Sequence, residues 1–155
     1  MAPADLSIAP FIRKMTHFDL EPVFSIEQVS YEFPWTMGIL TDCLRVGYHC
    51  FVYEQHDEIR AYAIISTVLD EAHLLNICVA PEYQRQGFGR QFLQWLMDFM
   101  REQGTKTMYL EVRMSNQTAI DLYQSMGFNE LGIRRNYYPT TQGREDAQLF
   151  ACEFF

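Results

Sequence analysis

A strand, a glycine-containing turn and a long amphipathic helix follow one another in the middle of the chain. Residues 74–79 form an apolar run, residues 84–90 read Gln-Arg-Gln-Gly-Phe-Gly-Arg, and apolar side chains then recur at spacings of three and four up to residue 103. Glycine lacks a Cβ atom, so the backbone bends sharply there and lets a ligand approach closely. The first N–H groups of the following helix have no intrahelical acceptor. The succession is typical of an α/β protein and predicts a phosphate-binding turn at residues 84–90.

Three ligand classes use turns of this kind, and the residues of the turn distinguish them. A Walker loop ends in Gly-Lys-Ser/Thr, whereas this chain has Gly89-Arg90-Gln91. A dinucleotide fingerprint requires Gly or Ala where the chain has Phe92, although Glu111 follows about 20 residues later, as the ribose-binding acid of that motif does. Dinucleotide binding therefore stays a minor alternative. A further alternative is that the turn binds no ligand and is an ordinary helix start that happens to contain glycine.

Composition and charge narrow the class of protein. The 155 residues are 48% apolar and 15% aromatic, which suits one core and predicts a single domain over residues 1–155. The N-terminus has no secretory pattern and no apolar run is long enough to span a membrane, so we expect a cytoplasmic protein without a membrane partner. The net charge of −8 argues against direct nucleic-acid binding and fits a cationic partner, although the charge by itself is better explained by acidity that merely aids solubility.

Neither the cysteines nor the histidines are spaced like metal ligands. The four cysteines stand singly without a C-x-x-C pair, and we expect them to be buried free thiols. Histidines 17, 49, 56 and 73 show no ligand spacing either. The sequence therefore predicts no metal site.

Alternating helical and β-rich runs predict a mixed, mostly antiparallel sheet with helices on both faces. Strands are expected at residues 7–13, 48–54, 59–69, 73–79, 107–113 and 148–154. Helices are expected from Asp19 to about residue 30 and at residues 37–45, 88–103 and 117–126, and residues 134–146 are expected to form a long loop. The strands at 73–79 and 107–113 should lie parallel because a helix connects them. Ligands of such sheets bind beyond the carboxyl ends of the parallel strands.

The second of these strands and the helix that follows it carry groups suited to proton transfer. Period-two alternation places Glu111 on the face opposite the apolar residues of its strand, where it is a candidate base; a Glu-Arg surface ladder is the alternative. Asn116 is expected to cap the next helix, and Tyr123 returns to the same helical face two turns later. The alternative for Tyr123 is packing in the core.

These segments resemble the signatures of the GNAT family of N-acetyltransferases. The pattern Gln84-x-x-Gly87-x-Gly89 is similar to the family's acetyl-CoA signature, and residues 111–128 resemble its second signature. Within the family, the chain most resembles the bacterial enzymes that acetylate the N-terminal alanine of a ribosomal protein. That resemblance runs through residues 33–35, 68–77, 110–113, 134–139 and 143–147.

The resemblance implies acetyl-CoA as the cosubstrate, no metal, and a GNAT fold in which the parallel strands splay apart around the acyl arm. The residues that it assigns to the cofactor are Ile77, Cys78, Val79, Arg85, Gln86, Gly87, Phe88, Gly89, Arg90 and Asn116. It assigns Glu111 as proton acceptor and Tyr123 as proton donor. The family expectation at position 78 is Ala, and Cys is a similarly small residue.

The resemblance also implies the acceptor, the N-terminus of a basic ribosomal protein that begins with alanine. Trp35, Tyr137 and Tyr138 would line its groove, with burial that anchors the loop as an equal alternative for the two tyrosines. A small-molecule amine acetyltransferase, an acetyltransferase of broad protein specificity and an acyl-CoA-binding sensor remain as alternatives. The presence of both Glu111 and Tyr123 argues against the sensor.

Overall fold

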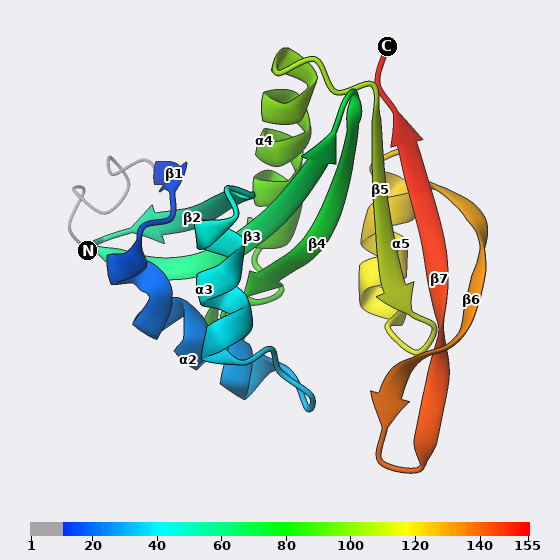
Figure 1. Ribbon diagram of the computed structural model, residues 1–155, viewed down its shortest axis with the longest axis horizontal. Coiled ribbons are helices and arrows are strands. Elements are labelled where there is room, and N and C mark those ends of the chain that lie inside the picture. Colours follow the sequence, from blue (N-terminus) through cyan, green and yellow to red (C-terminus); the bar gives the residue numbers. More distant parts are fainter. Residues whose placement is uncertain (1–10) are drawn as a thin grey trace. The chain divides into compact units, whose positions relative to one another are not determined.

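The computed structural model describes residues 11–155 (Figure 1), and most of the strand expected at residues 7–13 lies outside them. The described helices and strands are, in chain order, β1 (Phe11–Lys14), η1 (His17–Asp19), α2 (Leu20–Ser30), α3 (Met37–Arg45), β2 (His49–Gln55), β3 (Glu58–Val68), β4 (Glu71–Val79), η2 (Pro81–Tyr83), α4 (Phe88–Glu102), β5 (Thr107–Arg113), α5 (Gln117–Ser125), β6 (Asn129–Thr140) and β7 (Gly143–Glu153). Most of the expected elements are confirmed within one to three residues.

The described residues divide into two compact units, and the boundary crosses β3, β4 and α4. The first unit takes in residues 11–65 and 76–92, and the second takes in residues 66–75 and 93–155. The strands hydrogen-bond in the order β1-β2-β3-β4-β5-β7-β6. The expectation of a single domain stays a prediction.

The first unit contains an antiparallel array of strands and the helices α2 and α3. β1 pairs with β2, and β2 pairs with β3 through a hairpin. The two turn residues, His56 and Asp57, have positive φ angles of 54° and 59°, which match the right-handed twist of the flanking strands. The hairpin expected at residues 55–58 is therefore confirmed.

The second unit contains the parallel pair. Residues Glu71–Leu74 of β4 pair with Thr107–Leu110 of β5, whereas β5 pairs antiparallel with β7 and β7 antiparallel with β6. The buried residues of β5 alternate with half-buried ones, as expected from its sequence. The mixed, mostly antiparallel sheet is confirmed, and this pairing fixes the face on which Glu111 lies.

Helix α4 forms because its apolar residues recur on one stripe. Leu93, Leu96, Met97 and Met100 are almost completely buried in the second unit. The helix ends before Gly104, which has a φ of +96° and takes the left-handed position that glycine adopts without strain. Both the helix and its stop were expected from the sequence. No helix of the described residues is both long and apolar enough to cross a membrane.

The prediction of a long loop at residues 134–146 is wrong, because those residues form the end of β6, the turn and the start of β7. β6 is an edge strand of the sheet, and most of its residues are exposed. Exposed positions need no apolar side chains, so β6 lacks the alternating apolar pattern by which a strand is recognised in a sequence. Its register shifts between Arg134 and Tyr138, where Asn136 adopts a positive φ of 51°. Pairing with β7, rather than local pattern, makes this segment a strand.

The side chain of Asp19 has a different role from the one expected. Asp19 does precede α2, but its carboxylate makes no bond to the helix N–H groups. It instead accepts two hydrogen bonds from Arg13, at 2.8 and 2.9 Å, and one from the Thr16 N–H. The Arg13 guanidinium lowers the pKa of Asp19 below its ordinary value. The four cysteines are buried and free, as expected.

Candidate active site

The turn between β4 and α4 in the first unit is braced by its own glutamines. The Gln84 side chain donates from Nε2 to the Val79 carbonyl at 2.9 Å, and Gln86 donates from Nε2 to the Glu82 carbonyl at 3.2 Å. These bonds hold the chain on either side of the bend. Because these bonds are made by the glutamine side chains, they do not use the backbone N–H groups of Arg85, Gln86 and Gly87.

The backbone of this turn alternates in handedness. Arg85 has a φ of 63° and Gly87 a φ of +88°, whereas Gln86 between them is not left-handed. Such alternation turns successive N–H groups toward one side, where they form an anion-binding concavity. The Gln91 N–H, 3.1 Å from the Gly87 carbonyl, is the first to bond within α4, so the N–H groups before it point out of the helix start. A Cβ added to Gly87 would have no protein atom within 4 Å, so this side of the turn is open.

The end of β4 leads directly into the turn. The Ile77 carbonyl lies 3.2 Å from the Tyr31 hydroxyl, and the Val79 carbonyl accepts the bond from Gln84. The Cys78 thiol is a second, weaker donor to the Val79 carbonyl, with its Sγ 3.7 Å away. The Cys78 side chain is buried, and burial raises the pKa of its thiol, which makes it a packing group rather than a nucleophile.

Glu27 of α2 connects the segment of Trp35 to β4. Its carboxylate accepts hydrogen bonds from the Trp35 N–H at 2.8 Å, from the Asn76 amide at 2.9 Å and from the Tyr62 hydroxyl. Glu27 is only 2% exposed, and all three partners are neutral donors. Glu27 was not among the residues expected from the sequence, although a carboxylate on the apolar face of α2, beside Ile26, was a visible signal.

Glu27→Gln should lower the free energy of unfolding by about 1–3 kcal/mol. The glutamine amide has a donor where the carboxylate has an acceptor, so at least one buried donor loses its partner. Urea denaturation measures the change. Glu21→Gln, on an exposed position of the same helix, is the matched control and should shift stability by less than about 0.5 kcal/mol. Equal midpoints for the two variants would contradict the role of Glu27.

Glu111, in the second unit, is held by two side chains. Oε1 of Glu111 lies 2.5 Å from Nε2 of His73 on β4, and the Tyr137 hydroxyl also bonds the carboxylate. The bond from His73 is the largest cause that lowers the pKa of Glu111, the bond from Tyr137 adds to it, and burial opposes both. Glu111 is therefore ionised at neutral pH and has the charge state that a proton acceptor needs.

Tyr123 and Tyr138 lie close to one another in the same unit. Tyr123 is a buried residue of α5, and burial raises the pKa of its hydroxyl to about 12, so it keeps its proton at neutral pH. Burial also raises the pKa of Tyr138, and Glu111, Tyr137 and Tyr123 are near enough to contribute. The structure thus brings Glu111, Tyr137 and Tyr138 together, and Tyr123 is near enough to Tyr138 to act on the charge of its hydroxyl.

Arg113 fixes the hairpin that carries these tyrosines. Its Nη1 donates to the Pro139 carbonyl at 2.8 Å and to Glu145 at 2.9 Å, and its guanidinium lies 4.6 Å from the centre of the Tyr138 ring. Glu111 and Arg113 therefore have different partners. Neither His73 nor Arg113 was expected from the sequence to be a site residue. The signal that could have found them is that both lie on the same face of the sheet as Glu111.

The remaining predicted residues divide between the units. Asn116 caps α5, as expected, by accepting a bond from the Ala119 N–H at 3.2 Å, and its contact with a cofactor stays a prediction. Trp35 lies in the first unit with residues 77–79 and 85–90, and it is half-buried. Glu111, Asn116, Tyr123, Tyr137 and Tyr138 belong to the second unit.

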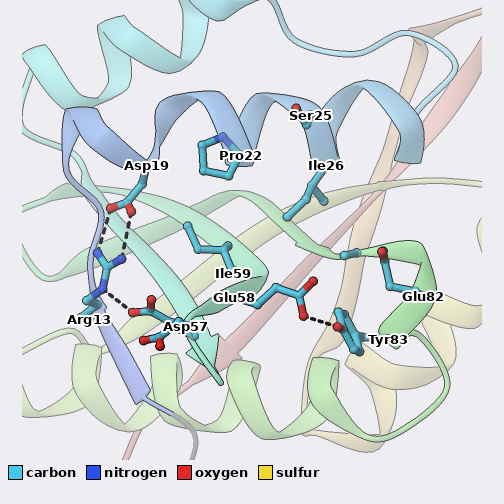
Figure 2. Close-up of a pocket in the computed structure, with 12 residues that line it drawn as sticks. Arg13, Asp19, Pro22, Ser25, Ile26, Asp57, Glu58, Ile59, Glu82 and Tyr83 are labelled. Atoms are coloured by element: carbon cyan, nitrogen blue, oxygen red, sulfur yellow. Dashed lines mark hydrogen bonds and ion pairs between the residues drawn. The ribbon is translucent and has the colours of Figure 1, made fainter.

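A separate pocket of about 540 Å³ lies in the first unit, and none of the predicted site residues lines it. Figure 2 shows Arg13 bonded to Asp19 on one side and Glu58 bonded to Tyr83 on the other. The lining is rich in carboxylates, two of which Arg13 neutralises. In the described part of the chain, no three side chains are grouped so as to hold a metal ion.

The chain is similar to known acetyltransferases in both sequence and fold. The Acetyltransferase (GNAT) family matches residues 10–128. The [ribosomal protein bS18]-alanine N-acetyltransferase of Escherichia coli is 50% identical over 133 residues, which are 86% of this chain and 90% of that protein. The crystal structure of the Escherichia coli ribosomal-protein-S18-alanine N-acetyltransferase superposes with a TM-score of 0.89 at 46% identity, covering 94% of each chain. Ard1 from Thermoplasma volcanium has a TM-score of 0.86 at 26% identity, covering 95% of this chain and 99% of that one.

Proposed function

The chain belongs to the acetyltransferase (GNAT) family, and from that premise we propose that it moves the acetyl group of acetyl-CoA to the N-terminal alanine of a bS18-like ribosomal protein. The observation that supports the acceptor most is the 50% identity, over most of both chains, to an enzyme of that name. The proposed substrate places the reaction in the cytoplasm, and the reaction needs no direct contact with nucleic acid.

The turn at residues 85–90 fits the pyrophosphate of acetyl-CoA. Its left-handed residues Arg85 and Gly87 and the open side of Gly87 leave backbone N–H groups accessible to an anion. The backbone of residues 77–79 would bond the pantetheine arm, and Asn116 would add a side-chain contact. These ten residues are the proposed cofactor site, and no metal is required.

Acetyl-CoA supplies a thioester carbonyl, which an uncharged amine attacks to give an amide and CoA. An ammonium group has no lone pair, so a base must first remove a proton, and ionised Glu111 is the proposed acceptor, directly or through water. Tyr123, whose burial keeps it protonated, would donate a proton to the leaving sulfur. A backbone N–H near Val79 would stabilise the negative charge that develops on the carbonyl oxygen.

The acceptor peptide would lie against aromatic side chains. The Tyr137 and Tyr138 rings are 4.8 Å apart, the Tyr137 hydroxyl bonds Glu111, and Trp35 is the third residue proposed to line the groove. Each ring is fixed by a neighbour, Tyr137 by Arg134 at 4.9 Å and Tyr138 by Arg113. Rings held next to the base would restrict the acceptor to a small first side chain such as that of alanine. The negative net charge of −8 would attract a basic peptide.

A peptide that begins Ala-Arg should be acetylated at least a hundredfold faster than the same peptide with a blocked N-terminus and a free lysine. At pH 7 an α-amine with a pKa near 8 is about 10% neutral, whereas lysine, near 10.4, is only about 0.04% neutral. This difference alone favours the N-terminus by a few hundredfold. Release of CoA from acetyl-CoA, followed by mass spectrometry of the peptide, measures both rates.

Two outcomes of the same assay would contradict the proposal. Equal rates on the two peptides would indicate an acetyltransferase of broad protein specificity. Faster reaction of polyamines or aminoglycosides than of any peptide would indicate a small-molecule acetyltransferase. An Ala-Arg peptide whose N-terminus and lysines are all blocked is the control for spontaneous hydrolysis of the thioester.

A further inference from the structure

His73 contacts the proposed base from the neighbouring strand. In the parallel register His73 of β4 is opposite Tyr109 of β5, one pleat before Glu111, so the three side chains share a face of the sheet. Nε2 of His73 and Oε1 of Glu111 are 2.5 Å apart. Two lone pairs at that distance would repel each other, so a proton lies between them, and His73 is the donor to an ionised Glu111.

The two side chains of this pair differ in exposure. The Glu111 side chain is 11% exposed and the His73 side chain is 39% exposed. Glu111 is thus largely removed from water, and protein donors must replace the water that would otherwise solvate its charge. The imidazole fixes one carboxylate oxygen in space.

Few other charged or titratable groups act on the pair. Tyr137, Tyr138 and Arg134, all from β6, interact with Glu111, and Tyr109 lies opposite His73 on β5. The part of β3 that belongs to this unit, residues 66–68, is Ser-Thr-Val and contains no titratable group. Arg134 contributes to Glu111 only as a nearby charge, whereas His73 and Tyr137 bond it directly.

We propose that His73 is a positioning residue for acetyl transfer, which acts by holding the Glu111 carboxylate ionised and oriented toward the acceptor amine. The inference rests on the proposed function, since it requires Glu111 to be the proton acceptor. Without the imidazole, the carboxylate would keep only Tyr137 as a direct donor and would sample other rotamers. Misdirection of the base by about 1 Å is enough to slow a reaction strongly.

The first experiment needs no substrate. In protein labelled with ¹³C at the glutamate carboxyl carbons, the Glu111 signal, assigned by its absence in Glu111→Gln, is titrated with pH. The wild-type midpoint should lie below the ordinary glutamate value of about 4.3, and in His73→Ala it should rise, because the largest cause of the lowered pKa is removed. An unchanged midpoint would overturn the pairing, even if no acetyl acceptor had been found.

The second experiment tests whether the orientation of the Glu111 carboxylate or its basicity governs the rate of acetyl transfer. His73→Ala should lower kcat on an Ala-Arg peptide by about tenfold or more, while KM for acetyl-CoA stays the same, because the base loses its orientation. His73→Gln, which keeps an amide donor near the position of Nε2, should restore most of kcat. A raised pKa makes Glu111 a stronger base, so a faster His73→Ala enzyme would mean that basicity alone governs the rate and would overturn the proposal.

A matched control excludes a general loss of folding. His49 is also a half-buried strand histidine, but it lies in the first unit, and His49→Ala should leave kcat and the Glu111 midpoint unchanged. A wild-type rate in His73→Ala, or a His73→Gln variant as slow as His73→Ala, would also overturn the role assigned to the imidazole. If wild-type protein acetylates no peptide, the proposed function fails, while the carboxyl titration still tests the His73–Glu111 pair.

Discussion

Glu111→Gln is expected to lower kcat on an Ala-Arg peptide by roughly 10²–10⁴, with little change in the affinity for acetyl-CoA. Glutamine has nearly the same shape as glutamate but cannot take a proton from an ammonium group. His73 and Tyr137 donate to the carboxylate, and glutamine keeps one oxygen that can accept from either of them. The loss is therefore expected in the chemical step. Single-turnover acetylation measures that step, and isothermal titration measures cofactor affinity.

Glu130→Gln is a suitable control, because Glu130 is an exposed residue on β6 of the same unit. It should keep the wild-type rate. Tyr123→Phe should also slow the chemical step, since it removes the proposed donor to the leaving sulfur but keeps the buried ring. Near-normal single-turnover rates in both Glu111→Gln and Tyr123→Phe would move the acid and base roles to other residues.

Gly87→Val is expected to weaken acetyl-CoA binding by at least about tenfold, which corresponds to about 1.4 kcal/mol. Gly87 has a φ of +88°, and the space where a Cβ would stand is open, so a valine side chain would occupy the position proposed for the pyrophosphate. Titration calorimetry of the folded variant with acetyl-CoA measures the loss.

Gly47→Val is the matched control for backbone strain. Gly47 also lies in the first unit, has a φ of +85° and has no protein atom within 4 Å of an added Cβ. Both variants should lose comparable stability, on the order of 1–2 kcal/mol, because a side chain is strained in the left-handed region. Only Gly87→Val should lose cofactor affinity. Equal affinities for the two variants would remove the pyrophosphate from this turn.

Much of the local structure around the candidate site was predictable because its signals are local. The glycines of the turn, the alternation along β5 and the cap at Asn116 each depend on residues within a few positions of one another. For the same reason α4 and its stop at Gly104 were expected within one residue. Local patterns, together with the family resemblance, led to Glu111 and Tyr123 as candidates.

The sequence by itself determined the elements, the turn and the chemical types of the candidate residues, since each follows from spacing along the chain. Only the tertiary structure decided that His73 bonds Glu111, that Glu27 holds the Trp35 segment, and that residues 134–146 pair as a hairpin. Glu27 and Trp35 are 8 residues apart in the sequence, and His73 and Glu111 are 38 residues apart. The hairpin depends on the pairing of an exposed edge strand. The physical reason is that a buried carboxylate and an edge strand are stabilised by donors that other elements bring to them, and no local periodicity records which donors those are.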